Sequence, residues 1–289
     1  MTNSQKDFLL KEIKGKVLFD EPLAKHTTLG VGGPAEAWVE PTDIPSLTKL
    51  VKFSIDEKIP LFAIGRGSNL LVRDDGVKGI VVRLNSPVFT YVKREGQSLR
   101  CGGGAEVGEA LKVARDNGLS GLEFVVGVPA TVGGAIKTNL SVSYPFKRGI
   151  KEVLDHVKML DGEKKEKDFP HIIIEAKFSL QRADKEAIAK KMDDFIAYRQ
   201  RTQELTLSSA GCIFKNPEGR KGAGWLIEQC GLKGKRIGGA EISSRHSNFI
   251  INHNQKAKAE NVLALIKIMR KEVQKRFNIH LKLEVEIWG

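Results

Sequence analysis

The chain has 289 residues, of which 41% are hydrophobic and 28% are charged, and its formal net charge is +12. This length and composition are typical of a soluble globular protein with two or three domains. No apolar run approaches the ~18 to 20 residues of a membrane span. The charged residues 1–17 do not resemble a secretory signal, so we expect a cytoplasmic protein without a membrane partner.

The three cysteines, Cys101, Cys212 and Cys230, are spaced widely along the chain. An odd number at such spacing argues against a disulfide framework and against a Cys-x-x-Cys metal site. We therefore expect free thiols in a reducing compartment and no bound metal.

The positive charge has two interpretations. The basic residues of the chain are scattered, and aromatic residues make up only 7% of it. The sequence therefore predicts no platform for stacking nucleic-acid bases. The excess charge either covers solvated helix faces or attracts anionic small molecules over a long range. The second interpretation predicts a small anionic ligand.

The first 84 residues predict the start of an α+β fold. Residues 1–25 contain a short helix, and the glycine-rich residues 26–34 predict an irregular loop. A strand over 35–40 is followed by a helix over 44–57, whose apolar residues recur at helical spacing. The alternation of strand, helix and strand is typical of α+β domains.

Residues 62–84 predict two strands around the polar loop Gly65-Arg66-Gly67-Ser68-Asn69. Two glycines that flank one residue allow positive φ and a close approach of the backbone to a ligand. The bare amide groups of such a loop can form a nest for a diphosphate. The alternative is a tight turn between strands, and the loop lacks the Gly-x-Gly-x-x-Gly spacing of a Rossmann unit.

The middle of the chain contains a second glycine-rich segment, residues 121–135. Two short strands over 89–102 and an amphipathic helix over 106–117 precede it. The segment is too apolar for a solvent loop, and its buried N–H groups need acceptors. Either a planar ligand with many acceptors or a buried glycine turn would satisfy them.

After this segment, strands over 153–160 and 172–180 are joined by a charged hairpin at 162–167. A long helix over 187–201 leads to a domain boundary near residue 200. The last third predicts helices over 223–230 and 257–277, strands over 248–252 and 281–288, and a basic glycine loop over 232–239.

Four polar residues of the last third are candidates for chemistry. Cys212 is either a buried small hydrophobe or a general acid, because a thiol with an ordinary pKa of roughly 8.5 is mostly protonated at neutral pH. Lys215 and Asn216 point to opposite faces of an extended segment, so one can meet a phosphate and the other a sugar or a carboxylate. The alternative is an exposed lysine followed by an asparagine in a turn. Glu284 shares its strand face with Glu286, and periodicity does not distinguish the two.

Six segments together resemble the UDP-N-acetylenolpyruvoylglucosamine reductases, flavoenzymes that complete UDP-N-acetylmuramate in peptidoglycan synthesis for the cell wall. The matching segments are HTTLGVGGPAE (26–36), IGRGSNLLVRDDGVKGIVV (64–82), GLEFVVGVPATVGGAIKTN (121–139), SAGCIFKNP (209–217), GLKGKRIGGAEIS (231–243) and LKLEVEIWG (281–289). The length resembles the shorter, second type of the family. The resemblance implies an α+β fold with a two-lobed FAD-binding domain of the vanillyl-alcohol-oxidase (PCMH) type over 1–84 and 85–200, and an α+β substrate-binding domain over 201–289.

The resemblance also implies the site residues. Those matching the family's FAD site are Gly65, Arg66, Gly67, Ser68, Asn69, Gly127, Pro129, Thr131, Gly133, Gly134 and Asn139. Those matching its substrate site are Lys215 and Asn216, and Lys233 of the basic loop is expected to attract the UDP group. Cys212 stands at the position of the proton donor, which is serine in many members, and Glu284 matches the catalytic glutamate.

The resemblance implies a monomer that binds FAD and no metal. It also implies a reaction with two halves. Hydride passes from NADPH to FAD, and then from the flavin to the methylene carbon of a UDP-linked enolpyruvyl sugar. Cys212 protonates the α-carbon, while Glu284, if burial keeps it protonated, hydrogen-bonds the developing charge on the substrate carboxylate.

The sequence departs from the family in one place. The usual Tyr-Arg-x-Ser segment, whose arginine polarises the substrate carboxylate, is replaced by the shorter residues 161–171, which contain no arginine. The usual Asn-x-Gly-Ala-Tyr-Gly is also altered, over residues 139–144. Either Arg148 or a lysine of 164–167 takes over this role, or the protein is an FAD-binding relative with reduced or no reductase activity. Another flavin oxidase of the same fold is the third alternative.

Overall fold

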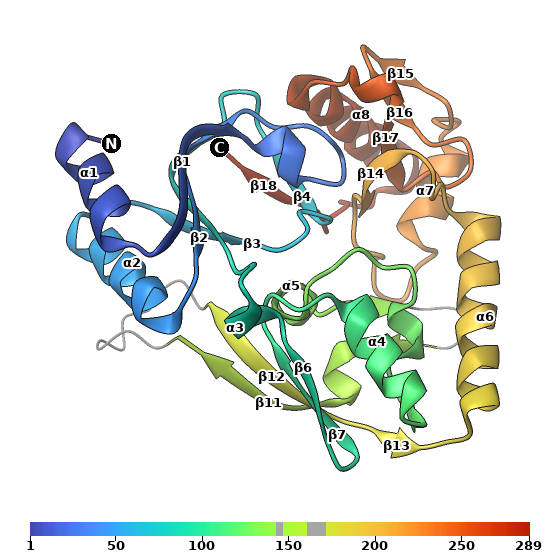
Figure 1. Cartoon of the computed structure of the whole chain (residues 1–289). Coiled ribbons are helices and arrows are strands. Elements are labelled where there is room, and N and C mark those ends of the chain that lie inside the picture. Colours follow the sequence, from blue (N-terminus) through green and yellow to red (C-terminus); the bar gives the residue numbers. More distant parts are fainter. Residues whose placement is uncertain (143–146, 161–171) are drawn as a thin grey trace. The chain divides into compact units, whose positions relative to one another are not determined.

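The computed structural model describes residues 1–142, 147–160 and 172–289, and its elements are shown in Figure 1. The chain forms two compact units, each assembled from three stretches of sequence. The first unit comprises Met1–Glu21, Glu36–Arg66 and Lys78–Tyr198, and the second comprises Pro22–Ala35, Gly67–Val77 and Arg199–Gly289. The sequence predicted three consecutive ranges instead, and that division into two lobes and a substrate domain stays a prediction.

One core of the first unit lies around a four-stranded sheet and two helices. The strands, in spatial order, are β1 (Gly15–Pro22), β2 (Pro34–Pro41), β5 (Val77–Arg83) and β3 (Leu61–Ile64), and the helices are α1 (Asn3–Glu12) and α2 (Ile44–Asp56). The Asp43 carboxylate accepts a hydrogen bond from the Ser46 amide at 2.7 Å and so begins α2. Leu47 and Leu50 of this helix are fully buried with Ile80 of β5. The strand expected over 35–40 and the helix expected over 44–57 are thereby confirmed.

A second core of the first unit belongs to an antiparallel sheet. Its strands, in spatial order, are β11 (Leu154–Met159), β12 (Ile173–Ser179), β7 (Ser98–Gly102) and β6 (Val92–Glu95). Helices α4 (Val107–Asp116) and α5 (Val132–Lys137) contact this sheet. The remaining elements are α3 (Pro87–Thr90), α6 (Lys185–Thr202), η2 (Glu123–Val125), η3 (Ile150–Glu152), and the ladders β8 (Leu119–Ser120) with β13 (Gln181–Arg182) and β9 (Ser141–Val142) with β10 (Arg148–Gly149). The hairpin expected at 162–167 lies outside the described residues.

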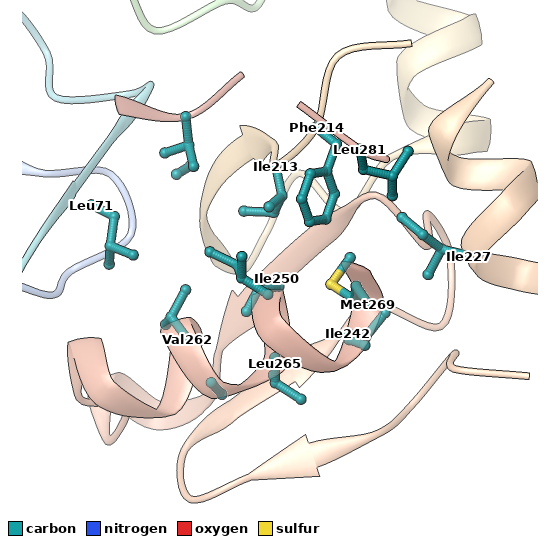
Figure 2. Close-up of a cluster of buried hydrophobic side chains, with 14 of the residues drawn as sticks. Leu71, Ile213, Phe214, Ile227, Ile242, Ile250, Val262, Leu265, Met269 and Leu281 are labelled. Atoms are coloured by element: carbon teal, nitrogen blue, oxygen red, sulfur yellow. The ribbon is translucent and has the colours of Figure 1, made fainter. Parts of the chain in front are cut away.

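The second unit is built on a small antiparallel sheet covered by helices. Its strands, in spatial order, are β14 (Ser208–Cys212), β17 (Phe249–Asn252), β16 (Ala240–Ile242) and β15 (Arg236–Ile237). The long helix α8 (Ala259–Phe277) packs on this sheet and against α7 (Ala223–Gln229). Figure 2 shows this core, where Val262, Leu265 and Met269 of α8 lie in one buried cluster with Ile250 of β17 and with Ile213, which follows β14.

Four short elements complete the second unit. Strand β4 (Leu70–Val72) pairs in parallel with β18 (Glu286–Trp288), and the helical turns are η1 (Leu23–His26) and η4 (His253–Gln255). No helix in the described part of the chain is both long and apolar enough to cross a membrane.

The structure differs from the sequence-based expectations in several places, and three of them have a clear physical reason. The strand expected over 281–288 is confined to β18, because the amides of Glu284 and Val285 both turn to the Ile213 carbonyl. Strand β4 was missed because three residues carry no periodicity. Helix α5 was missed because Gly133 and Gly134 are poor helix formers. The Thr131 hydroxyl caps this helix by accepting from the Gly134 amide at 3.2 Å.

Candidate active site

Cys212 ends strand β14, beside strand β17 of the second unit. Its pairing partner is Phe249, and the register shifts between Ser209 and Cys212. Gly211 lies inside this irregularity at φ +70°, a conformation that glycine adopts without strain. An irregular strand end of this kind can redirect a side chain away from the regular alternation of the sheet.

The surroundings of the Cys212 thiol shift its pKa in both directions. Burial raises the pKa to about 11, and the negative charge of Glu284 acts in the same direction. A hydrogen bond with the Asn248 side chain and the positive charge of Arg199 act in the opposite direction. The sequence assumed an ordinary thiol, whereas the folded environment keeps Cys212 more firmly protonated at neutral pH.

The backbone brings Glu284 next to the strand end that carries Cys212. The Glu284 amide donates to the Ile213 carbonyl at 2.9 Å, and Phe214 forms a β-bridge with Leu283. The Glu284 side chain is half-buried while Glu286 is exposed. Burial therefore distinguishes Glu284 from Glu286, which strand periodicity could not do. The fold of the second unit brings Cys212 and Glu284 together.

Two residues in this neighbourhood were missed by the sequence analysis. Asn248 is only 2% exposed, and its side chain donates to the Phe214 carbonyl at 2.8 Å and accepts from the Phe214 amide at 3.0 Å. A buried carboxamide that is bonded at both its oxygen and its nitrogen fixes the backbone next to the thiol. Its only signal in the sequence is a polar residue that precedes an apolar strand.

Arg199 is the second missed residue, and it lies near the end of α6. Burial lowers the pKa of its guanidinium, and the Cys212 thiolate acts in the opposite direction. Of the cations that the sequence proposed to replace the missing arginine, Arg148 is exposed and its Nη1 lies 2.9 Å from Glu152 Oε2 in the first unit. The lysines of 164–167 lie outside the described residues.

The three residues expected to bind substrate also lie in the second unit. Lys215 is exposed, and its amide donates to the Lys282 carbonyl at 2.9 Å. Asn216 is exposed too, but its Oδ1 accepts from the Ala223 amide at 2.9 Å, so the side chain also holds the start of α7. Lys233 Nζ lies 2.7 Å from Glu228 Oε1.

The two glycine-rich segments meet in the first unit. A Cβ on Gly65 would lie 2.4 Å from the Thr131 hydroxyl oxygen, so only glycine permits this approach. Arg66 Nε lies 3.6 Å from Glu106 Oε1, and Glu106 forms a β-bridge with Thr131. Residues that are about 65 positions apart in sequence therefore form one local structure.

In the second unit the loop continues with Gly67, Ser68 and Asn69. Gly67 has φ +59°, and a Cβ there would lie 2.3 Å from the His26 carbonyl oxygen. Among the described residues, no acceptor is found for the backbone amides of Arg66, Gly67 and Ser68. Free amide groups in a glycine turn fit a phosphate or another anion.

The remaining candidates lie on or near the surface of the first unit. Gly127, Pro129 and Asn139 are exposed, whereas Gly133 and Gly134 are half-buried. Gly127 has φ +69° with open space where a Cβ would stand. Most amides of this segment bond to the chain's own carbonyls, for example Val132 to Ala105 at 2.8 Å and Gly133 to Gly103 at 2.8 Å. The backbone thus does not need a ligand to satisfy these groups, although the glycines leave room for one.

The sequence matches two family profiles. Residues 35–165 match the FAD binding domain, and residues 202–288 match the C-terminal domain of UDP-N-acetylenolpyruvoylglucosamine reductase. These matches and the mixed helices and strands confirm the predicted α+β fold with an FAD-binding domain.

Individual relatives match over almost the whole chain. The UDP-N-acetylenolpyruvoylglucosamine reductase of Bacillus subtilis is 37% identical, with 97% of this chain and 98% of the relative covered. UDP-N-acetylenolpyruvoylglucosamine reductase 2 of Symbiobacterium thermophilum is 36% identical, with 95% and 93% covered. The crystal structure of the Thermus caldophilus reductase is 32% identical and superposes with a TM-score of 0.78, covering 96% of this chain and 100% of that one. The chain belongs to the UDP-N-acetylenolpyruvoylglucosamine reductase family.

Proposed function

We propose that this protein is an FAD-dependent reductase that uses NADPH to convert UDP-N-acetylenolpyruvoylglucosamine to UDP-N-acetylmuramate in the cytoplasm, acting as a monomer. Family membership and the match of residues 35–165 to the FAD binding domain support the reaction class. The observation that carries the assignment is the meeting of Cys212 and Glu284 at one strand end of the second unit.

When bound, FAD supplies the hydride acceptor for NADPH and the hydride donor for the enolpyruvyl methylene carbon. The residues proposed to hold FAD are the turn Gly65, Arg66, Gly67, Ser68 and Asn69 and the second segment with Gly127, Pro129, Thr131, Gly133, Gly134 and Asn139. The free amides of the turn fit the diphosphate, and the close packing of Gly65 on Thr131 supports a shared site.

Cys212 is proposed to donate the proton that the α-carbon of the substrate needs. A general acid must hold its proton until the transition state forms. Burial raises the thiol pKa to about 11, so at neutral pH nearly every molecule has the proton to give. The Asn248 side chain beside the thiol is itself held by two hydrogen bonds with the Phe214 backbone.

The other proposed roles concern charge. Glu284 is proposed as the catalytic carboxyl group at the reacting end of the substrate. Lys215, Asn216 and Lys233 are proposed to bind the nucleotide part, where a lysine can meet a phosphate as a point charge. Arg199, beside the thiol, is proposed as the cation that serves the substrate carboxylate in place of the missing arginine.

The test separates the two half-reactions by stopped-flow absorbance of the flavin. We expect Cys212→Ala to be reduced by NADPH at a normal rate but reoxidised by substrate at least about a hundredfold more slowly, because general acid catalysis contributes at least that much. Cys212→Ser is expected to restore part of the rate, since serine stands at this position in many family members.

Cys230→Ala is the matched control, because Cys230 follows α7 and lies outside the proposed site. Unimpaired reoxidation of Cys212→Ala by substrate would remove Cys212 from the mechanism. Rapid consumption of oxygen by the reduced wild-type protein, with no response to substrate, would instead support a flavin oxidase.

A further inference from the structure

The Asn69 side chain holds the backbone of Glu284. Asn69 Nδ2 donates to the Glu284 carbonyl oxygen at 3.0 Å, and the Asn69 carbonyl accepts from the Glu286 amide at 3.0 Å. The parallel ladder between β4 and β18 begins one residue later, with Leu70 opposite Glu286. The Asn69 side chain therefore adds a hydrogen bond to Glu284, two residues before Glu286, where the paired strands begin.

Glu284 is consequently fixed on both sides. Its amide bonds to the Ile213 carbonyl at 2.9 Å, and its carbonyl receives the Asn69 carboxamide. The residues around it, 281–285, form no regular strand, so these two bonds stand in for the missing ladder. A reacting carboxylate needs to be held within about 0.5 Å of its productive position.

We propose that Asn69 is a positioning residue for Glu284, an inference that rests on the catalytic role proposed for that glutamate. The resemblance placed Asn69 in the loop that holds the FAD diphosphate, without a separate role for its side chain. One of its two carboxamide N–H groups is engaged by the Glu284 carbonyl, whereas the backbone amides of Arg66, Gly67 and Ser68 are free to meet the diphosphate. The turn then has two roles. Its backbone amides bind the cofactor, and the side chain of its last residue, Asn69, holds Glu284.

The experiment uses the FAD-loaded full chain with Asn69→Asp, which keeps the shape of the side chain but places a carboxylate oxygen against the Glu284 carbonyl. We expect the limiting rate of flavin reoxidation by substrate to fall about tenfold, with the substrate KM changed by less than about twofold, because a misplaced carboxylate weakens transition-state interactions more than binding. Asn254→Asp is the matched control, since Asn254 is exposed in the same unit and the substitution adds the same charge.

The affinity for FAD, measured by flavin fluorescence, distinguishes the two roles of Asn69. The positioning role predicts a dissociation constant within about twofold of the wild-type value, because the backbone amides are unchanged. A large loss of FAD affinity would overturn the inference in favour of a cofactor contact. Where Asn69→Asp does not yield folded protein, Asn69→Ala removes the donor without adding charge and carries the same test.

A double-mutant cycle with Glu284→Gln separates this inference from the function on which it rests. If Asn69 acts through Glu284, then Asn69→Asp changes reoxidation by less than about twofold in the Glu284→Gln background, because coupled residues are not additive. Additive losses would overturn the positioning role, as would a wild-type rate in Asn69→Asp. Normal reoxidation of Glu284→Gln alone would instead remove Glu284 from the mechanism and leave the proposed function without its carboxylate.

Discussion

The chemistry proposed for Cys212 depends on its being a weaker acid than a thiol in water. Burial is the largest influence, and it disfavours the thiolate because a charge loses solvation in the protein interior. Asn248 and Arg199 offset part of this effect. The thiol is therefore suited to giving a proton once and regaining it, rather than to acting as a nucleophile.

We predict that the rate of flavin reoxidation by substrate stays high through mildly alkaline pH and falls only as the pH passes about 11. The sign follows from the role, since a general acid works only while protonated and loses its proton above its pKa. Stopped-flow rates measured across alkaline pH check this.

Cys212→Ser is the control for the pH profile, because a hydroxyl group does not ionise in this range and the alkaline decline should vanish. A wild-type decline centred near the ordinary thiol pKa of roughly 8.5 would contradict the buried environment of Cys212.

Helix α8 shows how a short loop stabilises a long element. Asp74, in the loop between β4 and β5, accepts from the amides of Ala259 and Glu260 at 2.8 and 3.0 Å. The first amides of a helix lack partners within the helix, and a carboxylate there also interacts favourably with the helix dipole. The segment VRDDG thus contributes to the second unit through a contact far away in sequence.

We predict that Asp74→Ala lowers the free energy of unfolding by about 1 to 2 kcal/mol, the usual cost of losing a helix cap. Urea denaturation followed by circular dichroism measures this. Asp75→Ala removes the same charge from the exposed neighbouring position and should cost less than about 0.5 kcal/mol. Equal effects of the two substitutions would show that charge, rather than capping, is responsible.

Two glycines with the same backbone conformation allow sterics to be separated from conformational strain. Gly67 and Gly96 have φ +59° and +64°, yet a Cβ on Gly67 would meet the His26 carbonyl oxygen at 2.3 Å while one on Gly96 would meet nothing within 4 Å. Both substitutions to alanine force a residue with a Cβ into the left-handed conformation, which is strained. Only Gly67→Ala also creates a clash with the backbone of His26.

We predict that Gly96→Ala destabilises the protein by about 1 to 2 kcal/mol, the cost of the left-handed conformation alone. Gly67→Ala should cost more and should also weaken FAD binding, because the loop must move away from residues 26–27. Urea denaturation and fluorescence titration with FAD measure the two quantities. Equal stabilities together with unchanged FAD affinity would count against a close-packed cofactor loop.

For the whole molecule the excess of basic residues is the dominant electrostatic feature. The 47 lysines and arginines exceed the 35 aspartates and glutamates by 12. Several basic side chains are engaged locally, among them Lys233 with Glu228 and Arg236 with Glu241. Local pairs cancel short-range fields, but the total charge still attracts anions from a distance.

We predict that kcat/KM for the UDP-sugar falls several-fold when sodium chloride rises from about 0.02 to 0.5 M, because the Debye length shrinks to a few ångströms. Most of the change should appear in KM, since steering affects encounter rather than chemistry. A neutral osmolyte at matched osmolarity is the control. If kcat/KM does not change with salt, the excess positive charge does not attract the substrate and only solvates the surface.

Much of this protein follows from its sequence. The amphipathic helix α8 and helix α2 carry enough periodic residues to be predicted, because their burial repeats with the helical period. The glycine segments, the Ser-Ala-Gly-Cys segment and the terminal Glu284 also carried the resemblance that the comparisons confirm at the level of the family.

Only the tertiary structure decided the environment of the site. Strand β4 exists because it pairs with β18, and the irregular residues 281–285 bond to residues 213–215, which follow β14. Such long-range bonds leave no periodic trace in three to five residues. The partners of Cys212 and Glu284, namely Asn248, Arg199 and Asn69, come from distant parts of the chain for the same reason. Residue types fix which chemistry is available, whereas the pKa of a thiol or the position of a carboxylate depends on burial and neighbours that exist only after folding.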